Sequence, residues 1–210
     1  MSPTLSAIVT ALNGVLVGLV MASPLIWGLR RSTRSWRHLA THDEVTGLPN
    51  RRAVLTALHR TLRTGCPAGF IMIDLDHFKT INDQWGHESG NDLLAMVGQR
   101  LADLPPPVRM AARLSGDEFA LLVDTDQVAV CARQAWRAIC VHPIALDTVD
   151  VPVAASVGYT TIRPGISPRQ VLREADEAMY HAKTTGCGVV GAPTPTTGTP
   201  GRCRDRRHRP

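Results

Sequence analysis

Four carboxylates in two short stretches of the sequence could act together on a metal ion. Asp74 and Asp76 end the apolar run 69–76, and side chains at i and i+2 of a strand point to the same side. Asp117 and Glu118 lie between two further apolar runs, where a hairpin with a turn at 115–118 is expected. If these strands pair, carboxylate oxygens converge at one place, and such hard ligands favour Mg²⁺ or Mn²⁺ over zinc. Acidic residues that simply cap turns are the alternative, and spacing alone does not decide between the two.

Polar side chains and glycines follow in the segment 77–91. Lys79 is a point charge suited to a phosphate, and Asn82 has the donor and acceptor edge that a purine base needs. Gly86 and Gly90 permit a close approach of backbone to a ligand. We expect a short turn followed by a loop that carries His87, although a lone histidine in a loop also has a structural interpretation.

The elements that would position these side chains follow from periodicity and turn signals. Helices are predicted at 49–63, 91–104, 126–141 and 167–183, the last with Ser167 as N-cap and Pro168 at its first position. Strands are predicted at 69–76, 109–114, 119–123 and 151–162, with a short edge strand at 187–190. This order predicts an α+β fold with helices packed on a sheet.

The segment 5–29 carries no charge, and a helix of that length exceeds the hydrocarbon core of a bilayer, which is about 30 Å thick. Four arginines follow within 30–37 and none precedes, so the positive-inside rule places the rest of the chain in the cytoplasm. We therefore expect one transmembrane helix at 5–29 in the inner (cytoplasmic) membrane, followed by a juxtamembrane linker at 30–42. A buried core helix is the alternative.

The formal net charge of +5 comes from arginines near the two ends of the chain, at 30–37 and 202–209, so no basic nucleic-acid-binding face is expected. The segment 192–210 is rich in Pro, Thr and Arg and is predicted to be disordered. The five cysteines form no CxxC pair and no metal-ligand spacing.

Five stretches of the sequence, at 43–52, 73–91, 112–123, 155–160 and 175–186, resemble the GGDEF family of diguanylate cyclases. The resemblance implies that 43–191 form a domain akin to nucleotidyl cyclases and polymerase palms, with a central antiparallel sheet flanked by helices. It also implies condensation of two GTP into cyclic di-GMP with release of two pyrophosphates, each GTP held by one subunit of a homodimer.

Metal and catalytic roles follow from the same resemblance. Asp74 would bind both Mg²⁺ (or Mn²⁺) ions, and the backbone carbonyl of Leu75 would bind one of them. Asp117 would be a metal ligand and the proton acceptor for the attacking 3′-hydroxyl, and Glu118 a further ligand. Lys79 would stabilise charge on the phosphates. Two metal ions would serve the nucleophile and the leaving group.

Substrate binding is implied for a second set of residues. Asn82 and Asn91 would read the guanine, His87 would help to hold the substrate, and Lys183 would reach the triphosphate. Phe78 belongs to the same set.

The sequence departs from the family pattern at several positions. Ser115 stands where a glycine is usual, Asn91 where an aspartate is usual, and Cys187 where an arginine is usual. Pro106 and Arg109 replace the ends of the R-x-x-D pattern used in product inhibition, so that inhibitory site is predicted to be absent. Two functions therefore stay open: a membrane-tethered cyclase, and a degenerate module for regulation or dimerisation that binds GTP weakly or not at all.

Overall fold

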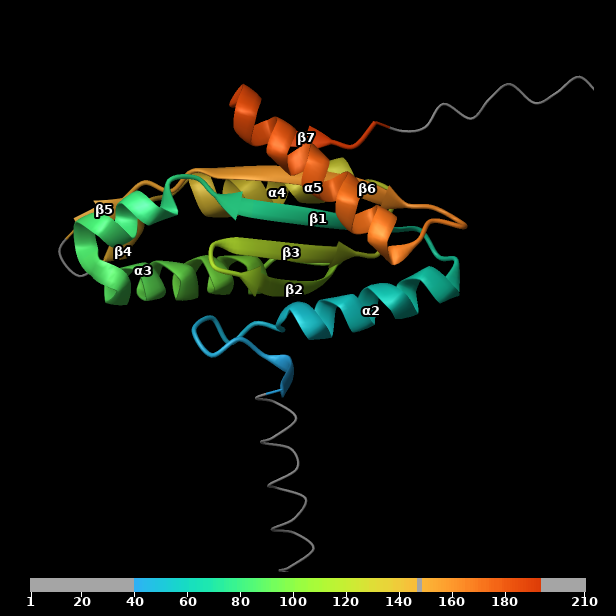
Figure 1. Cartoon of the computed structure of the whole chain (residues 1–210), viewed down its shortest axis with the longest axis horizontal. Coiled ribbons are helices and arrows are strands. Elements are labelled where there is room, and N and C mark those ends of the chain that lie inside the picture. Colours follow the sequence, from blue (N-terminus) through green and yellow to red (C-terminus); the bar gives the residue numbers. More distant parts are fainter. Residues whose placement is uncertain (1–39, 147–148, 194–210) are drawn as a thin grey trace, which may run out of the picture.

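A computed structural model describes residues 40–146 and 149–193 of the chain (Figure 1). The helices are α2 (Arg51–Thr64), α3 (Phe78–Ala102), α4 (Val128–Cys140) and α5 (Pro168–Thr185). The strands are β1 (Ala68–Leu75), β2 (Val108–Ser115), β3 (Glu118–Val123), β4 (Ile144–Leu146), β5 (Val149–Val151), β6 (Ala155–Ile162) and β7 (Val189–Gly191). The predicted α+β class is confirmed. The predicted strand 151–162 is divided, because its first residue closes a small β4–β5 hairpin that the periodicity did not indicate.

The main sheet has five strands in the order β2-β3-β1-β6-β7. Strand β1 runs antiparallel to both β3 and β6, but β7 runs parallel to β6. The predicted antiparallel sheet is therefore wrong at this edge, and the sheet is mixed. The reason is the connection: helix α5 returns the chain across the sheet, so the next strand starts at the same end as β6.

Strand β1 is buried on both sides, and its alternation sorts the helices into two layers. Ile71, Ile73 and Leu75 pack in a cluster with residues of α3 and α4. Phe70 and Met72 face the other way and pack in a second cluster with residues of α2 and α5. Figure 1 shows α5 crossing in front of the sheet and α2 running along the lower edge, next to β2, with α4 behind the sheet. Even-numbered positions of β1 therefore point toward α5.

Local capping explains where two helices begin. Asn50 accepts a hydrogen bond from the backbone N–H of Ala53 at the start of α2. Ser167 accepts one from the N–H of Gln170 at the start of α5, as predicted. Pro168 occupies the first turn, where its missing N–H costs nothing.

Helix α3 differs most from the prediction. The segment expected as a turn and loop is helical from Phe78 onward, and the helix continues to Ala102. Its regularity is interrupted only at Gly86, which has φ 85° and ψ 163°. The sequence hid this first half because apolar residues are few there: Ile81 is buried and Trp85 packs against the core. His87 therefore lies on a helix and not in a loop.

Within the described residues, no helix is both long enough and apolar enough to cross a bilayer. The predicted transmembrane segment 5–29, nearly all of the linker at 30–42 and the tail from 194 onward lie outside these residues.

Glu174 of α5 provides a pH-dependent test of the fold. It accepts hydrogen bonds from Arg163, Thr160 and Gln170. The bond from Arg163, opposed by burial, lowers the pKa of Glu174 from 4.5 to about 2. Because the folded-state pKa lies below the unfolded one, this stabilisation is complete above pH 4.5 and is lost as pH falls toward 2. We expect Glu174→Gln to remove about 2 kcal/mol at pH 7, measured by urea unfolding.

The difference between wild type and Glu174→Gln should shrink as the pH is lowered from 5 to 3. Glu177→Gln is the matched control, because Glu177 is exposed and, within the described residues, pairs only with Arg173 at 3.8 Å. A Glu174→Gln effect that is constant over this pH range contradicts the assignment.

Candidate active site

Asp74 and Glu118 are cross-strand neighbours at one end of the sheet. Asp74 continues the even-numbered face of β1 that points toward α5, and the register pairs it directly with Glu118 of β3. The backbone N–H of Leu75 donates to the carbonyl of Asp117, 3.2 Å away. The pairing of β1 with β3 therefore brings the carboxylates of both stretches to one place.

Lys183 of α5 joins this group from the helix above. Its Nζ lies 2.5 Å from Oδ1 of Asp74, whose side chain is 13% exposed. The hydrogen bond to Asp74 raises the pKa of Lys183 against the opposing effect of burial, and the charges of Asp74, Asp76 and Asp117 add to the rise. The ammonium group is thus the counter-charge of the acidic cluster, which consists of Asp74, Asp117 and Glu118.

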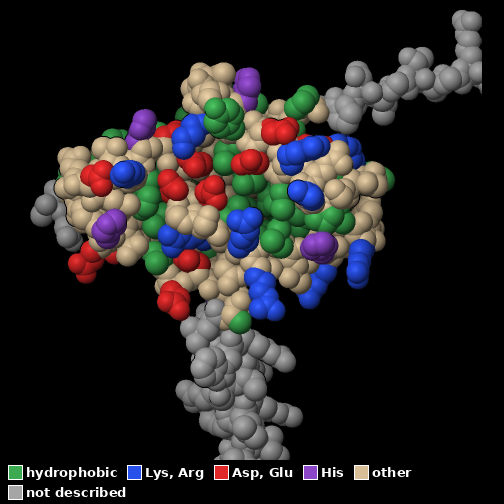
Figure 2. Space-filling model, in the orientation of Figure 1, with side chains coloured by type: hydrophobic (Ala, Val, Ile, Leu, Met, Phe, Trp, Pro, Cys, Tyr) green, Lys and Arg blue, Asp and Glu red, His purple; other side chains and the backbone are tan. Residues whose placement is uncertain are grey.

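Asp117 has an environment that suits a proton acceptor. Burial raises the pKa of its carboxyl, and the negative charges of Asp74 and Glu118 raise it further, while a backbone hydrogen bond and Lys183 oppose the rise. A carboxylate with a raised pKa is a better base than an ordinary aspartate. Figure 2 shows acidic side chains gathered near the middle of this face, with basic side chains among and around them.

The donor types at this site fit a hard divalent cation, since every side-chain ligand is a carboxylate oxygen. Within the described residues, however, no three His, Cys, Asp or Glu side chains are gathered closely enough to form a ready metal site. The ammonium of Lys183 contacts Asp74 instead. A cation bound by Asp74 would therefore have to compete with Lys183 for this carboxylate.

The hairpin turn is shorter than predicted and consists of Gly116 and Asp117 only. Gly116 has φ 50°, whereas Ser115 lies in strand β2 without a positive φ. Serine at this position is therefore not strained. Its hydroxyl donates to Oε2 of Glu118 at 2.8 Å, which adds a contact that a glycine could not make.

Arg113 ties this turn to the start of the domain. Its Nε and Nη2 donate to the carbonyl of Gly116 at 2.9 and 2.7 Å, and its Nη1 donates to Oδ1 of Asp43 at 2.9 Å. Burial raises the pKa of Asp43, but the hydrogen bonds from Arg113 and Thr46 together outweigh it and lower the pKa. Sequence reasoning missed this link, because the two residues stand 70 positions apart.

The start of α3 lies next to the carboxylates in the chain. Asp76 accepts a hydrogen bond from the buried hydroxyl of Ser156, a partner that the sequence did not indicate. The helix begins two residues later, so the N–H groups of Phe78 and Lys79 have no partners within the helix. Such an N-terminus, with the exposed ammonium of Lys79, suits a phosphate group.

The other predicted substrate-binding residues lie further along α3. Asn82 is half-buried, and His87 and Asn91 are exposed. Cys187 is exposed directly after Gly186, which ends α5. These positions are not joined to the acidic cluster by any hydrogen bond in the part of the chain that the structure describes.

Arg109 has a structural role in the fold. It forms an ion pair with Asp124 at 3.2 Å and donates to the hydroxyl of Thr61. It is therefore held against neighbouring elements at the position where the family pattern has an aspartate.

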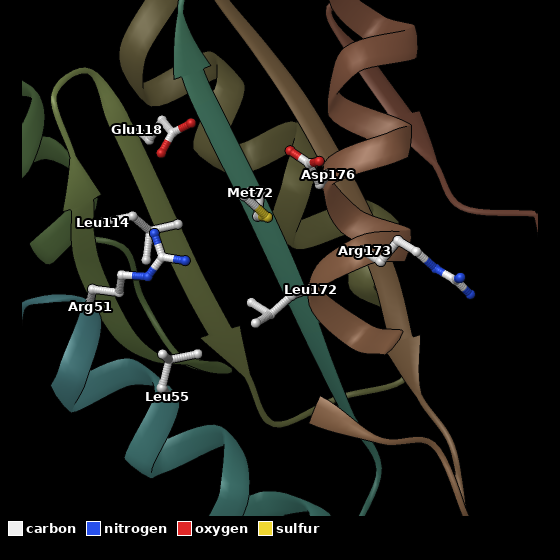
Figure 3. Close-up of a pocket in the computed structure, with 8 residues that line it drawn as sticks. All are labelled: Arg51, Leu55, Met72, Leu114, Glu118, Leu172, Arg173 and Asp176. Atoms are coloured by element: carbon white, nitrogen blue, oxygen red, sulfur yellow. The ribbon is translucent and has the colours of Figure 1, made fainter. Parts of the chain in front are cut away.

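A pocket of about 300 Å³ lies on the α2 and α5 face of the sheet, with Glu118 at one end. Leu55, Met72, Leu114 and Leu172 supply its apolar lining, and the charged residues are Arg51, Arg173, Asp176 and Glu118. Figure 3 shows Arg51 reaching over Leu114, whereas Arg173 points away from the pocket. The sequence did not predict this pocket, because its walls come from strands and from two helices that lie far apart in the sequence.

Comparison with known proteins agrees with this fold. Residues 40–188 match the family described as "Diguanylate cyclase, GGDEF domain". The coiled coil and GGDEF domain of DgcB from Caulobacter crescentus, solved in complex with c-di-GMP, superposes with a TM-score of 0.76. That match has 27% sequence identity and covers 85% of this chain and 99% of the other.

Two curated relatives have sequence identities to this chain of more than 30%. An uncharacterized signaling protein of Caulobacter vibrioides is 37% identical over 169 residues, which cover 76% of this chain and 21% of that protein. The bifunctional diguanylate cyclase/cyclic di-GMP phosphodiesterase MucR of Pseudomonas aeruginosa is 33% identical over 171 residues, which cover 78% of this chain and 25% of MucR.

The fold is thus an α+β domain with a mixed central sheet, of the kind found in GGDEF cyclases. The chain belongs to the GGDEF-domain family of diguanylate cyclases. It spans only about a fifth to a quarter of the length of these two relatives.

Proposed function

We propose that this protein is a diguanylate cyclase that condenses two GTP molecules into cyclic di-GMP and releases two pyrophosphates. The observation that carries the proposal is the meeting of Asp74, Asp117, Glu118 and Lys183 at one end of the β1–β3 pair. Three carboxylates at one end of a sheet repel one another, and the single ammonium group of Lys183 balances only one of these charges. A structural role alone does not explain why they lie together. Each GTP is held by one subunit of a homodimer, and the two sites face each other.

The chemistry assigns a task to each group. Asp117 accepts the proton of a 3′-hydroxyl, whose oxygen then forms a bond to the α-phosphorus of the opposite GTP as the bond to pyrophosphate breaks. The same step repeated in the other direction closes the ring. Lys79 and Lys183 balance the negative charge of the triphosphate. Asp74, Glu118 and the carbonyl of Leu75 would hold Mg²⁺ or Mn²⁺, which when bound neutralises charge on the phosphates.

Substrate recognition is assigned to helix α3. Asn82 and Asn91 contact the guanine edge, with His87 and Phe78 beside them. Asn91 offers one acceptor oxygen where an aspartate offers two, so the protein is expected to bind GTP more weakly than a protein with aspartate there.

A second candidate function is a degenerate regulatory or dimerisation module. Asn91 and Cys187 favour it, because each removes a charge from a position that the family uses to bind the nucleotide. In this case Asp74 and Lys183 would form a permanent ion pair of structural value.

We also propose that the protein is anchored in the cytoplasmic membrane by one helix at 5–29, with the catalytic domain in the cytoplasm. The uncharged length of this segment and the four arginines after it support the proposal. Retention of the full chain in the membrane fraction after an alkaline wash tests it, and release into the supernatant contradicts it.

The test of the enzymatic function is incubation of the purified full chain with GTP and Mg²⁺, followed by assay of cyclic di-GMP and pyrophosphate. Asn91→Asp and Cys187→Arg should each tighten GTP binding by about tenfold, because each restores a charge-assisted contact. Met96→Leu, on the outer side of α3, is the control that should change nothing. No product at high protein concentration, together with no gain in GTP affinity from either substitution, favours the degenerate module.

A further inference from the structure

A close contact joins the two halves of helix α3. A side-chain carbon added at Gly90 would lie 1.9 Å from Oδ1 of Asn82 and 3.4 Å from Cζ of Phe78. Real Cβ atoms do not come as close as 1.9 Å to another heavy atom. The amide of Asn82 therefore fills the space that any side chain at position 90 would need, and only glycine leaves this space open.

The kink at Gly86 creates this contact. In a straight helix, residues eight positions apart are separated by about 12 Å along the axis, too far for Asn82 to reach Gly90 in this way. Gly86 has φ 85° and ψ 163°, a conformation reserved in practice for glycine, and the first half of the helix folds back from there. Asn91 is the residue after Gly90, so the kink also brings Asn82 to the part of α3 that carries Asn91.

We propose that Gly90 is a positioning residue for base recognition, because the space left by its missing side chain allows Asn82 to take the orientation that reads the guanine. This inference rests on the proposed GTP substrate. Phe78 lies on the other border of the same space, with its Cζ 3.4 Å from the position of the added carbon, so Asn82 occupies a confined site beside Gly90 before the nucleotide arrives. A side chain fixed in its binding orientation loses less entropy when the ligand binds.

Different residues are proposed to recognise the base and to bind the triphosphate. The groups proposed to hold the phosphates, Lys79 and Lys183, are not among the atoms nearest to a side-chain carbon added at Gly90. A methyl group at position 90 should push Asn82 out of place and weaken the contact with the base, while the contacts with the phosphates persist.

The experiment compares the affinity of the full chain for GTP and for ATP in the presence of Mg²⁺. ATP has the same triphosphate but lacks the guanine edge. Gly90→Ala should lower the preference for GTP over ATP by about tenfold, the value of one hydrogen bond, and leave the affinity for ATP unchanged. Gly98→Ala is the matched control on the same helix. A carbon added there would lie 2.9 Å from Cβ of Thr46, so it crowds the packing without touching Asn82.

A thermal double-mutant cycle tests the contact without nucleotide. Gly90→Ala should lower Tm by about 3–6 °C when Asn82 is present, because the added methyl group overpacks the site. In the Asn82→Ala background the same substitution should leave Tm unchanged or raise it slightly, because alanine favours the helix and the obstructing amide is gone.

Each outcome decides the question. If wild type prefers GTP and Gly90→Ala keeps the full preference, the positioning role is overturned while the proposed function stands. If wild type does not prefer GTP over ATP, the proposed substrate fails and the inference falls with it, even when the thermal cycle shows coupling. Equal effects of Gly90→Ala on Tm in both backgrounds overturn the contact itself.

Discussion

Asp117→Asn is expected to reduce the formation of cyclic di-GMP by about a thousandfold, the typical contribution of a general base. The amide cannot accept the proton of the 3′-hydroxyl, and it removes a negative charge from the acidic cluster. The fold should not suffer, because Asp74 and Glu118 each lose a repulsive neighbour. Product assay and thermal unfolding of the same preparation measure both effects.

Asp176→Asn is the control for this variant, since Asp176 is an exposed carboxylate on α5 outside the cluster. We expect it to keep wild-type turnover. Turnover by Asp117→Asn within a few fold of wild type would remove the assignment of Asp117 as proton acceptor. A lower Tm of Asp117→Asn would instead indicate that the carboxylate stabilises the turn.

Lys183→Met is expected to weaken GTP binding by about 10- to 100-fold, because one charge-assisted contact to the triphosphate is lost while an unbranched apolar stem is kept. It should also lower stability by about 1–3 kcal/mol, since Asp74 loses its counter-charge at a largely buried position. Titration with GTP and urea unfolding measure the two effects separately.

Lys183→Arg should recover part of both losses, because the charge remains although the shape differs. Arg173→Met is the control on the same helix, as Arg173 points away from the pocket and is exposed (Figure 3). A Lys183→Met variant that loses stability but binds GTP like wild type assigns Lys183 to the fold alone, in agreement with the degenerate module.

The helices and most strands could be predicted because each has a local cause. Burial on both sides of β1 produces its continuous apolar run, and Ser167 and Pro168 mark the start of α5 within a few residues. The first half of α3 could not be found in the same way, because few apolar residues and two glycines mask a helix held by Ile81 and Trp85.

The site divides in the same manner. Alternation along β1 and the hairpin after β2 place Asp74 beside Glu118 from local pattern alone, provided that the strands pair. The 109 positions between Asp74 and Lys183 carry no such pattern. Their contact exists because α5 packs on the even-numbered face of β1 and its last turn reaches the strand end.

The sequence by itself determined the family, the α+β class and the residue types of the acidic site, because these depend on period-two and helical patterns and on short motifs. The tertiary structure decided which groups meet: Lys183 with Asp74, Arg113 with Asp43, and Asn82 with Gly90. It also showed that Ser115 is an unstrained strand residue bonded to Glu118. The physical reason is that long-range contacts are set by how helices pack on the sheet, and no local stretch of sequence records that packing.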